Sequence, residues 1–146
     1  MIYTGETANA RYGRIVLGIY TALNGLLLIV GCAGAWFFNA RANSHGIAPN
    51  TTLGFRSQHT LASLHGWYVA QRVGFHFVAV ATTAITVAVF VIVAVAFIRR
   101  LNALWIFIVP VIGAVALAVC FMIAGHRADH AAISVETPPP SSAAST

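Results

Sequence analysis

Three long apolar stretches constrain the fold of this chain more than any other feature of its sequence. Residues 15–38, 73–98 and 103–125 contain no Asp, Glu, Lys or Arg. A helix of about 20 apolar residues spans the hydrocarbon core of a bilayer, and a segment surrounded by lipid must satisfy its backbone hydrogen bonds within itself. The sequence therefore predicts an all-α membrane protein with three transmembrane helices.

The composition supports a location in the bilayer. The 146 residues are 59% hydrophobic and only 8% charged, and the mean hydropathy is +0.83, whereas a soluble domain carries about 25% charged residues. The net charge of +5 comes from arginines that lie singly or in pairs at the ends of the apolar stretches. This arrangement favours contact with anionic lipid headgroups over nucleic acid. We therefore expect membrane lipid as a partner and no nucleic acid.

The polar segments complete the predicted organisation. A loop that contains several Asn residues, two Gly and one Pro precedes a helix-compatible run over 60–72, so we expect a short helix between the first two spans. The chain ends in a Pro-, Ser- and Thr-rich stretch, which is typical of disorder. The predicted order is a polar N-terminus (1–14), a first span (15–38), a loop and short helix (39–72), a second span (73–98), a third span (103–125) and a polar, disordered tail (126–146).

Residues 49–74, called the signature segment below, form a long polar and aromatic passage within this apolar chain. Gly54 lies in a stretch that predicts a turn, and Arg56, two residues later, is an isolated cation. Ser57 and Thr60 follow, and both are of the residue types that cap helix N-termini. We expect any residue-specific function of the protein to lie in this segment.

The order of residues in the signature segment resembles the signature of the SdpI-type immunity protein family. These are small bacterial integral membrane proteins, some of which protect a cell against its own secreted peptide toxin. The matching residues are Asn50, Gly54, Phe55, Arg56, Ser57, Thr60, Trp67 and Gly74. Family members usually carry an acidic residue just before the Trp, where this chain has His65 and Gly66. We therefore expect Arg56 to bind backbone carbonyls, a lipid phosphate or another protein.

The resemblance implies a non-enzymatic function at the bacterial cytoplasmic membrane. It predicts an immunity or protective factor that recognises a toxin peptide or a lipid. The implied binding residues are Asn50, Gly54, Phe55, Arg56, Ser57, Thr60 and Trp67. An accessory subunit of a larger bacterial membrane complex is the second interpretation. Arg56 is either a fixed cation of the binding site or a side chain that only extends to the headgroup level.

Small residues in and around the signature segment predict close helix packing. They recur every four positions and so share one helix face: Ala62, Gly66, Ala70 and Gly74. In lipid, such a ridge lets another helix approach closely. A helix that lies on the membrane surface, with Trp67 anchored at headgroup depth, is an equally open interpretation. Asn24 lies in the middle of the first span, and its amide predicts contact with another helix.

The ionisable residues argue against catalysis, metal binding and ion-coupled transport. The three acids all lie outside the predicted spans and are Glu6, Asp129 and Glu136; transporters usually keep such groups at membrane depth. His126 and His130 would share a helix face, but two imidazoles without a third ligand make a weak metal site. We therefore expect no catalytic residue, no metal site and no cofactor.

Overall fold

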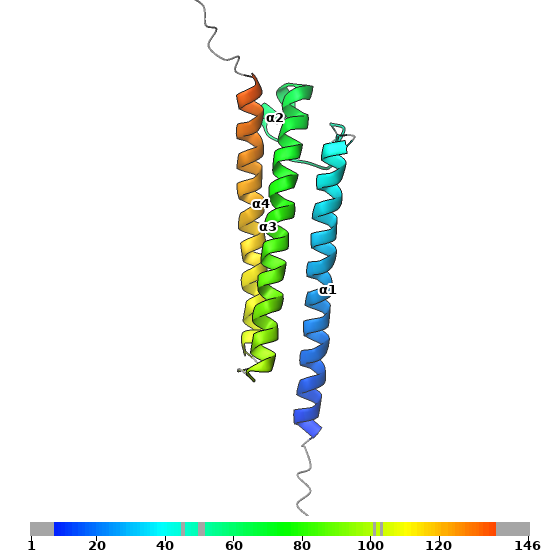
Figure 1. Cartoon of the computed structure of the whole chain (residues 1–146), viewed down its shortest axis with the longest axis vertical. Coiled ribbons are helices and arrows are strands. Elements are labelled where there is room, and N and C mark those ends of the chain that lie inside the picture. Colours follow the sequence, from blue (N-terminus) through cyan, green and yellow to red (C-terminus); the bar gives the residue numbers. More distant parts are fainter. Residues whose placement is uncertain (1–7, 45, 50–51, 101, 103, 137–146) are drawn as a thin grey trace, which may run out of the picture.

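The structure, a computed structural model, describes residues 8–44, 46–49, 52–100, 102 and 104–136 (Figure 1). This part of the chain contains four helices. They are α1 (Ala8–Ser44), α2 (Gln58–Ala62), α3 (Leu64–Ile98) and α4 (Leu104–Glu136). Three of them are long and apolar enough to cross a membrane, and the short α2 lies between the first two. The predicted all-α fold with three spans and a short intervening helix is confirmed, and the chain is a multi-pass membrane protein.

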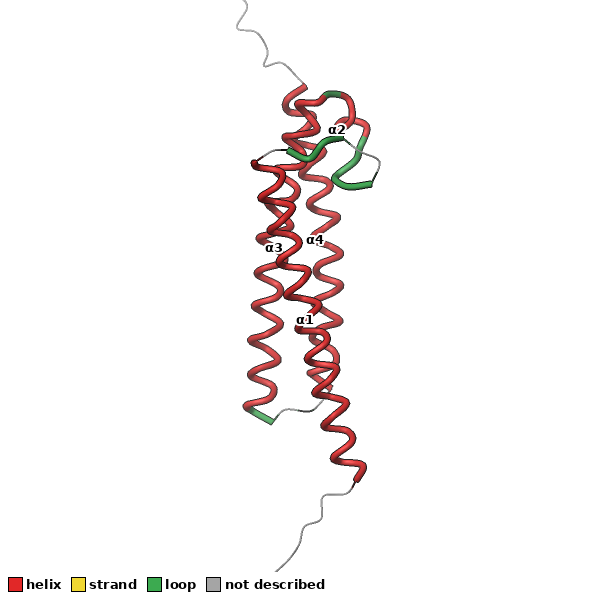
Figure 2. Tube along the Cα trace, turned by 90° about the vertical axis from the view of Figure 1, so that its right-hand side faces the viewer, coloured by secondary structure: helices red, strands yellow, loops and turns green. Residues whose placement is uncertain are grey.

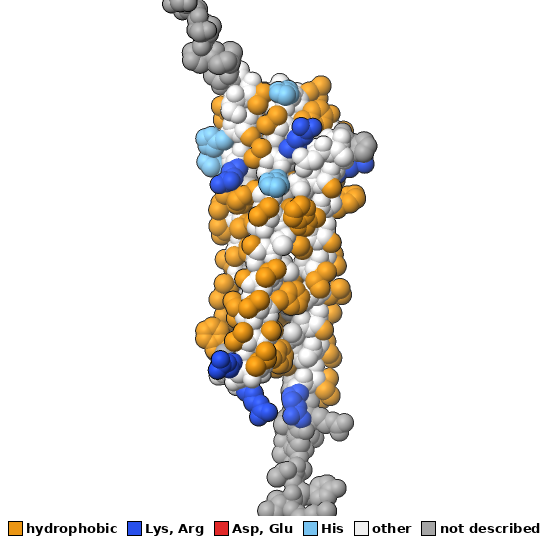
Figure 3. Space-filling view, in the orientation of Figure 1, with side chains coloured by type: hydrophobic (Ala, Val, Ile, Leu, Met, Phe, Trp, Pro, Cys, Tyr) orange, Lys and Arg blue, Asp and Glu red, His pale blue; other side chains and the backbone are white. Residues whose placement is uncertain are grey.

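The long helix α3 is the centre of the bundle. It packs against both α1 and α4, and consecutive long helices run in opposite directions (Figure 1). The tube in Figure 2 places α2 and the loop before it at the end of the bundle where α1 and α4 finish. Arg side chains gather at both ends of the molecule, His side chains near the α2 end, and an apolar band lies between them (Figure 3). This band matches the hydrocarbon layer of a bilayer.

Each long helix exceeds the predicted span. The first span was predicted over 15–38, but α1 has 37 residues and runs from Ala8 to Ser44. A helix of this length is about 55 Å long, whereas the hydrocarbon core is about 30 Å thick. Uncharged runs mark only the part of a helix that lies in hydrocarbon, and the residues that flank this run do not stop the helix. Residues 39–44, predicted as loop, therefore belong to α1.

The predicted division between a short helix at 60–72 and a span at 73–98 is wrong. The helical conformation is interrupted at Ser63 instead, where φ is −144° and ψ is 151°. The helix α3 then continues without interruption from Leu64 to Ile98. The Ser63 hydroxyl caps α3 by accepting a hydrogen bond from the Gly66 N–H at 3.0 Å. The signature Trp67 is consequently part of a transmembrane helix and not of the short helix.

The third span also continues further than predicted. Residues 126–136, which were assigned to a disordered tail, form the last turns of α4, while residues 137–146 lie outside the described part of the chain. The helix continues because Ala128 and Ala132, both with no exposed surface, pack against Ala70 of α3. These contacts stabilise the helix beyond the point where its apolar sequence ends.

Small residues allow α3 and α4 to approach closely along their length. At Gly113 of α4, an added Cβ would lie 2.9 Å from Cγ2 of Val89 in α3, too close for a carbon contact. Two helices in lipid gain little from the hydrophobic effect, so their association depends on this kind of close van der Waals packing. Gly113 is therefore a position where the bundle has no room for a side chain.

The contact between α1 and the other helices is looser. The Trp36 indole N–H donates to the Thr83 hydroxyl of α3 at 2.9 Å, and the Tyr20 ring lies 4.7 Å from that of Phe107 in α4. Asn24 lines an apolar cavity together with residues of α3 and α4, as predicted from its position. Its amide, however, donates to the Tyr20 carbonyl of its own helix at 2.9 Å, so this hydrogen bond needs no second helix.

We expect Gly113→Leu to destabilise the bundle by about 1–3 kcal/mol, because the new side chain overlaps Val89. The matched control is Gly18→Leu in α1, where an added Cβ meets no atom within 4 Å. Thermal unfolding in detergent measures both. An unchanged midpoint for Gly113→Leu, or an equal decrease in the two variants, would contradict the close approach of α3 and α4.

Candidate functional site

The loop before α2 folds back over the first turns of α3. Trp67 is 1% exposed, and its indole N–H donates to the carbonyl of Ile47 in this loop. Gly46 has a φ of +71°, and an added Cβ there would lie 2.6 Å from Cε1 of Tyr68. Trp67 is therefore not an exposed anchor that contacts lipid headgroups, as the surface-helix interpretation requires. The loop supplies a protein partner for the indole, so this side chain is buried.

Gln71 fixes the middle of the signature segment. Its side chain has no exposed surface; its Oε1 accepts from the Phe55 N–H and its Nε2 donates to the Phe55 carbonyl, each at 2.9 Å. One amide thus satisfies both backbone groups of a residue that is outside any helix. Gly54, with a φ of +110°, passes so close that an added Cβ would lie 2.5 Å from the Gln71 oxygen. The glycine is required here for both reasons.

Gln71 was not among the residues predicted to form the site. A signal for it exists, because Gln71 follows Trp67 by four residues and precedes Gly74 by three, and so shares a helix face with both. A polar amide on the face that carries the small residues of a membrane helix is expected to bind backbone groups of a packed segment.

Phe55 is inserted between α3 and α4. Its ring covers Gly74 so closely that an added Cβ would lie 2.2 Å from Phe55 Cε2, and it packs on the buried alanine cluster that contains Ala70 and Ala128. The ring of Phe75 lies 5.2 Å from it. The ridge of small residues therefore receives a loop phenylalanine as well as a helix.

The other members of the predicted ridge lie in two different environments. An added Cβ at Gly66 would lie 3.0 Å from Ser63 Oγ and 3.6 Å from the Cβ of Ala132, so Gly66 also faces α4. Ala62 is exposed, and its predicted contact with another helix is wrong. The reason is the extended residue Ser63, which ends α2 and separates Ala62 from the helix that carries the ridge.

Ser57 and Thr60 form a capping box at the start of α2. The Thr60 N–H donates to Ser57 Oγ at 3.1 Å, and the Ser57 N–H donates to Thr60 Oγ1 at 2.7 Å. The Ser57 hydroxyl in turn donates to Oδ1 of Asp129 on α4, 72 residues away in the sequence. The cap therefore ties the signature segment to the third transmembrane helix.

A polar cavity of about 330 Å³ opens between the signature segment and α4. It is lined by Phe55, Arg56, Ser57, Thr60, Gly125, His126 and Asp129. A guanidinium, a carboxylate, an imidazole and two hydroxyls thus surround one space, which we call the signature cavity. The sequence around Arg56 contains no carboxylate, but α4 brings Asp129 to the same cavity.

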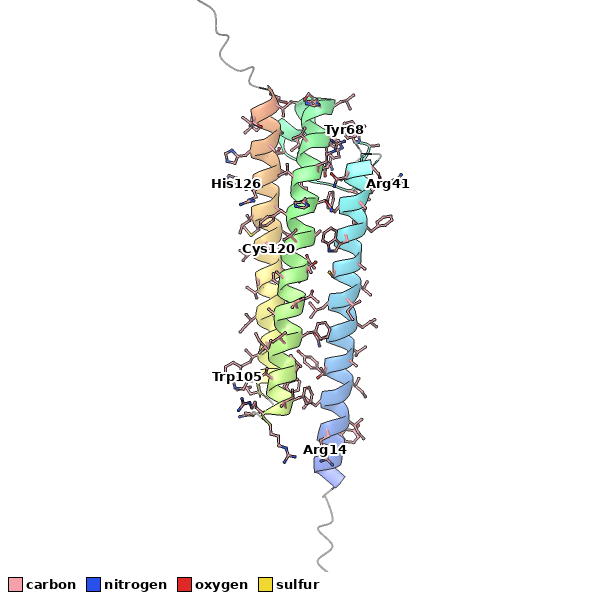
Figure 4. The ribbon with its side chains drawn as sticks, viewed as in Figure 1. Arg14, Arg41, Tyr68, Trp105, Cys120 and His126 are labelled. Carbon is pink, nitrogen blue, oxygen red and sulfur yellow. The ribbon has the colours of Figure 1, made fainter. Side chains whose placement is uncertain are left out.

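The signature cavity lies at one end of the apolar band. Arg72 and Arg127 mark this end on α3 and α4, and Figure 4 places Arg41 of α1 and His126 near it as well. The Arg127 guanidinium lies 4.8 Å above the Phe77 ring, and the Arg72 Nε donates to the carbonyl of Ala42 at 3.3 Å. Both arginines thus have protein partners, and the cavity opens near the depth of lipid headgroups.

The remaining predicted site residue, Asn50, lies outside the described part of the chain. Within that part, no group of three or more His, Cys, Asp or Glu side chains is arranged to hold a metal ion.

Comparison of the chain with protein-family models, curated proteins and solved structures finds no match. The resemblance to SdpI-type proteins stays a prediction.

We expect Gln71→Leu to release the loop from α3, because both backbone groups of Phe55 lose their partner, at a cost of about 1–3 kcal/mol for each buried group left unpaired. The matched control is Gln58→Leu, the same change at an exposed glutamine of α2. Limited proteolysis with trypsin in detergent should then cleave after Arg56 faster in Gln71→Leu alone. Equal cleavage rates in wild type and Gln71→Leu would show that the amide does not hold the loop.

Proposed function

We propose that this protein is a non-enzymatic immunity or protective factor of the bacterial cytoplasmic membrane, similar to the SdpI-type proteins. In this proposal the signature cavity recognises a toxin peptide or a lipid at the membrane surface. The observation that carries the proposal is the position of Arg56, which is exposed and lines a polar cavity near headgroup depth.

The walls of the signature cavity support a role in recognition because they are held in place by specific contacts. The backbone of Phe55 is held by Gln71, and its own ring packs over Gly74. Ser57 is held by Thr60 and Asp129. A site whose walls are preorganised loses less conformational entropy on binding. Fixed walls around an exposed guanidinium are what the recognition of a polar group requires.

The chemistry of the cavity suits an anionic or zwitterionic group. The planar guanidinium of Arg56 can form two parallel hydrogen bonds with a phosphate or a carboxylate. The Asp129 carboxylate and the nearby hydroxyls can accept hydrogen bonds from ammonium or amide groups. Lipid headgroups and peptides both present such combinations, so both remain within the proposal.

The proposal predicts that Arg56→Lys loses protection about as completely as Arg56→Ala, because a point charge does not replace a planar fork. The assay is survival of a deletion strain that carries each variant, at matched expression, when it is challenged with membrane-active peptides. Arg41→Lys is the control, since this exposed arginine lies near the same membrane end but does not line the cavity. Full protection by Arg56→Lys would remove Arg56 from the binding site.

The exposure of α1 favours a second candidate function, that of an accessory subunit in a larger membrane complex. None of the residues in the most apolar window of α1 is buried against the rest of the described chain, whereas 28% of the corresponding window of α3 is. A partner helix would cover this surface, although lipid alone is also a suitable environment for it. Purification from native membranes separates the two functions, because an obligate subunit retains a partner at a fixed ratio and a protective factor that acts alone does not.

A further inference from the structure

Two histidines on the outer side of α4 form a close pair. His126 and His130 are one helical turn apart, their Nε2 atoms are 3.2 Å apart, and their rings meet edge to face at an interplanar angle of 83°. Both side chains are exposed. Figure 4 shows His126 projecting from α4 on the side away from α3.

Helix geometry explains why this pair points outward. At about 100° per residue, the midpoint of His126 and His130 lies about 180° from the buried face formed by Ala124, Ala128 and Ala132. The same alanines that pack the end of α4 against α3 therefore turn the imidazoles toward the surroundings. An ion in solution at the membrane surface can reach them.

We propose that His126 and His130 chelate one divalent transition-metal ion of the kind that imidazole prefers, such as Cu²⁺ or Zn²⁺. Zn²⁺, which is tetrahedral and has metal–nitrogen bonds of about 2.0–2.1 Å, holds two ligand nitrogens about 3.3 Å apart. The observed separation of 3.2 Å between the two Nε2 atoms is close to this value. The two side chains are thus already placed for an ion to bind both nitrogens with little rearrangement.

Binding of the ion moves one proton within the donor ring and releases none. Without a metal, one neutral imidazole donates its Nε2–H to Nε2 of the other ring. When the ion binds, the donor ring changes tautomer, so that its proton moves from Nε2 to Nδ1, and both Nε2 lone pairs face the ion. Both rings stay neutral, as a metal ligand requires. No oxidant or other reactant is involved.

The charged neighbours of the pair on α4 are engaged elsewhere. The Arg127 guanidinium lies over the Phe77 ring of α3, and Oδ1 of Asp129 accepts the Ser57 hydroxyl. No third His, Cys, Asp or Glu of the described residues completes a ligand group with the pair. In the proposed complex, water therefore fills the remaining positions of the ion.

The test uses the full chain in detergent, purified with an affinity tag that contains no histidine. Titration with Zn²⁺ by calorimetry and with Cu²⁺ by electron paramagnetic resonance should show one ion per chain, with two nitrogens coordinated to Cu²⁺. In His126→Ala and in His130→Ala we expect the affinity for the ion to fall by about tenfold or more, because the second ligand no longer acts at high effective concentration. We also expect both variants to lose the two-nitrogen signal of Cu²⁺. Thermal unfolding confirms that these exposed positions leave the fold intact.

Two further variants make the outcome decisive. His65→Ala removes an exposed histidine outside the pair and should bind as wild type does. His130→Ala combined with Ser134→His keeps the number of histidines but separates the two imidazoles by two turns, and should bind as weakly as His130→Ala. Affinity within threefold of wild type in His126→Ala, or two-nitrogen coordination retained in the combined variant, would overturn the proposal.

Discussion

The signature segment depends on one buried amide. Phe55 is outside any helix, yet its N–H and carbonyl lie against two transmembrane helices, where unpaired backbone groups are costly. Gln71 satisfies both groups, and the other requirements follow from this pair. Gly54 must lack a side chain because the amide occupies that space, and Gly74 must lack one because the Phe55 ring lies over it. Phe55 is thus held against α3 and α4 although it belongs to no helix.

This architecture gives the residues of the signature segment two different roles. Gly54, Phe55 and Trp67 are buried or packed and serve the fold, whereas Arg56 is exposed at the signature cavity. Ser57 belongs to both groups, because it caps α2 and also donates to Asp129. Substitutions at the packed positions will therefore remove the site by releasing the loop. A change at the exposed Arg56 instead tests recognition itself.

The extension of α4 beyond the apolar band links the fold to the proposed chemistry. The buried alanines continue the helix toward its end, and this continuation brings Asp129 and His126 to the signature cavity and turns the His126–His130 pair away from the alanine face that packs on α3. A disordered tail at this point would have provided neither feature. The polar end of the protein is thus built by three helices that extend past the hydrocarbon layer and by the loop that they enclose.

The sequence by itself determined the three transmembrane helices, because lipid leaves a long uncharged segment no other way to satisfy its backbone. It also indicated the capping residue Ser57 and the face that carries Gly66 and Gly74, since caps and helix faces depend on neighbours within a few residues. The burial of Trp67 and the contact of Ser57 with Asp129 were decided only by the tertiary structure. Their partners lie 20 residues away for the Trp67 indole and 72 residues away for the Ser57–Asp129 contact. Local spacing carries no information about such partners, because they depend on how the loop closes over the helix ends.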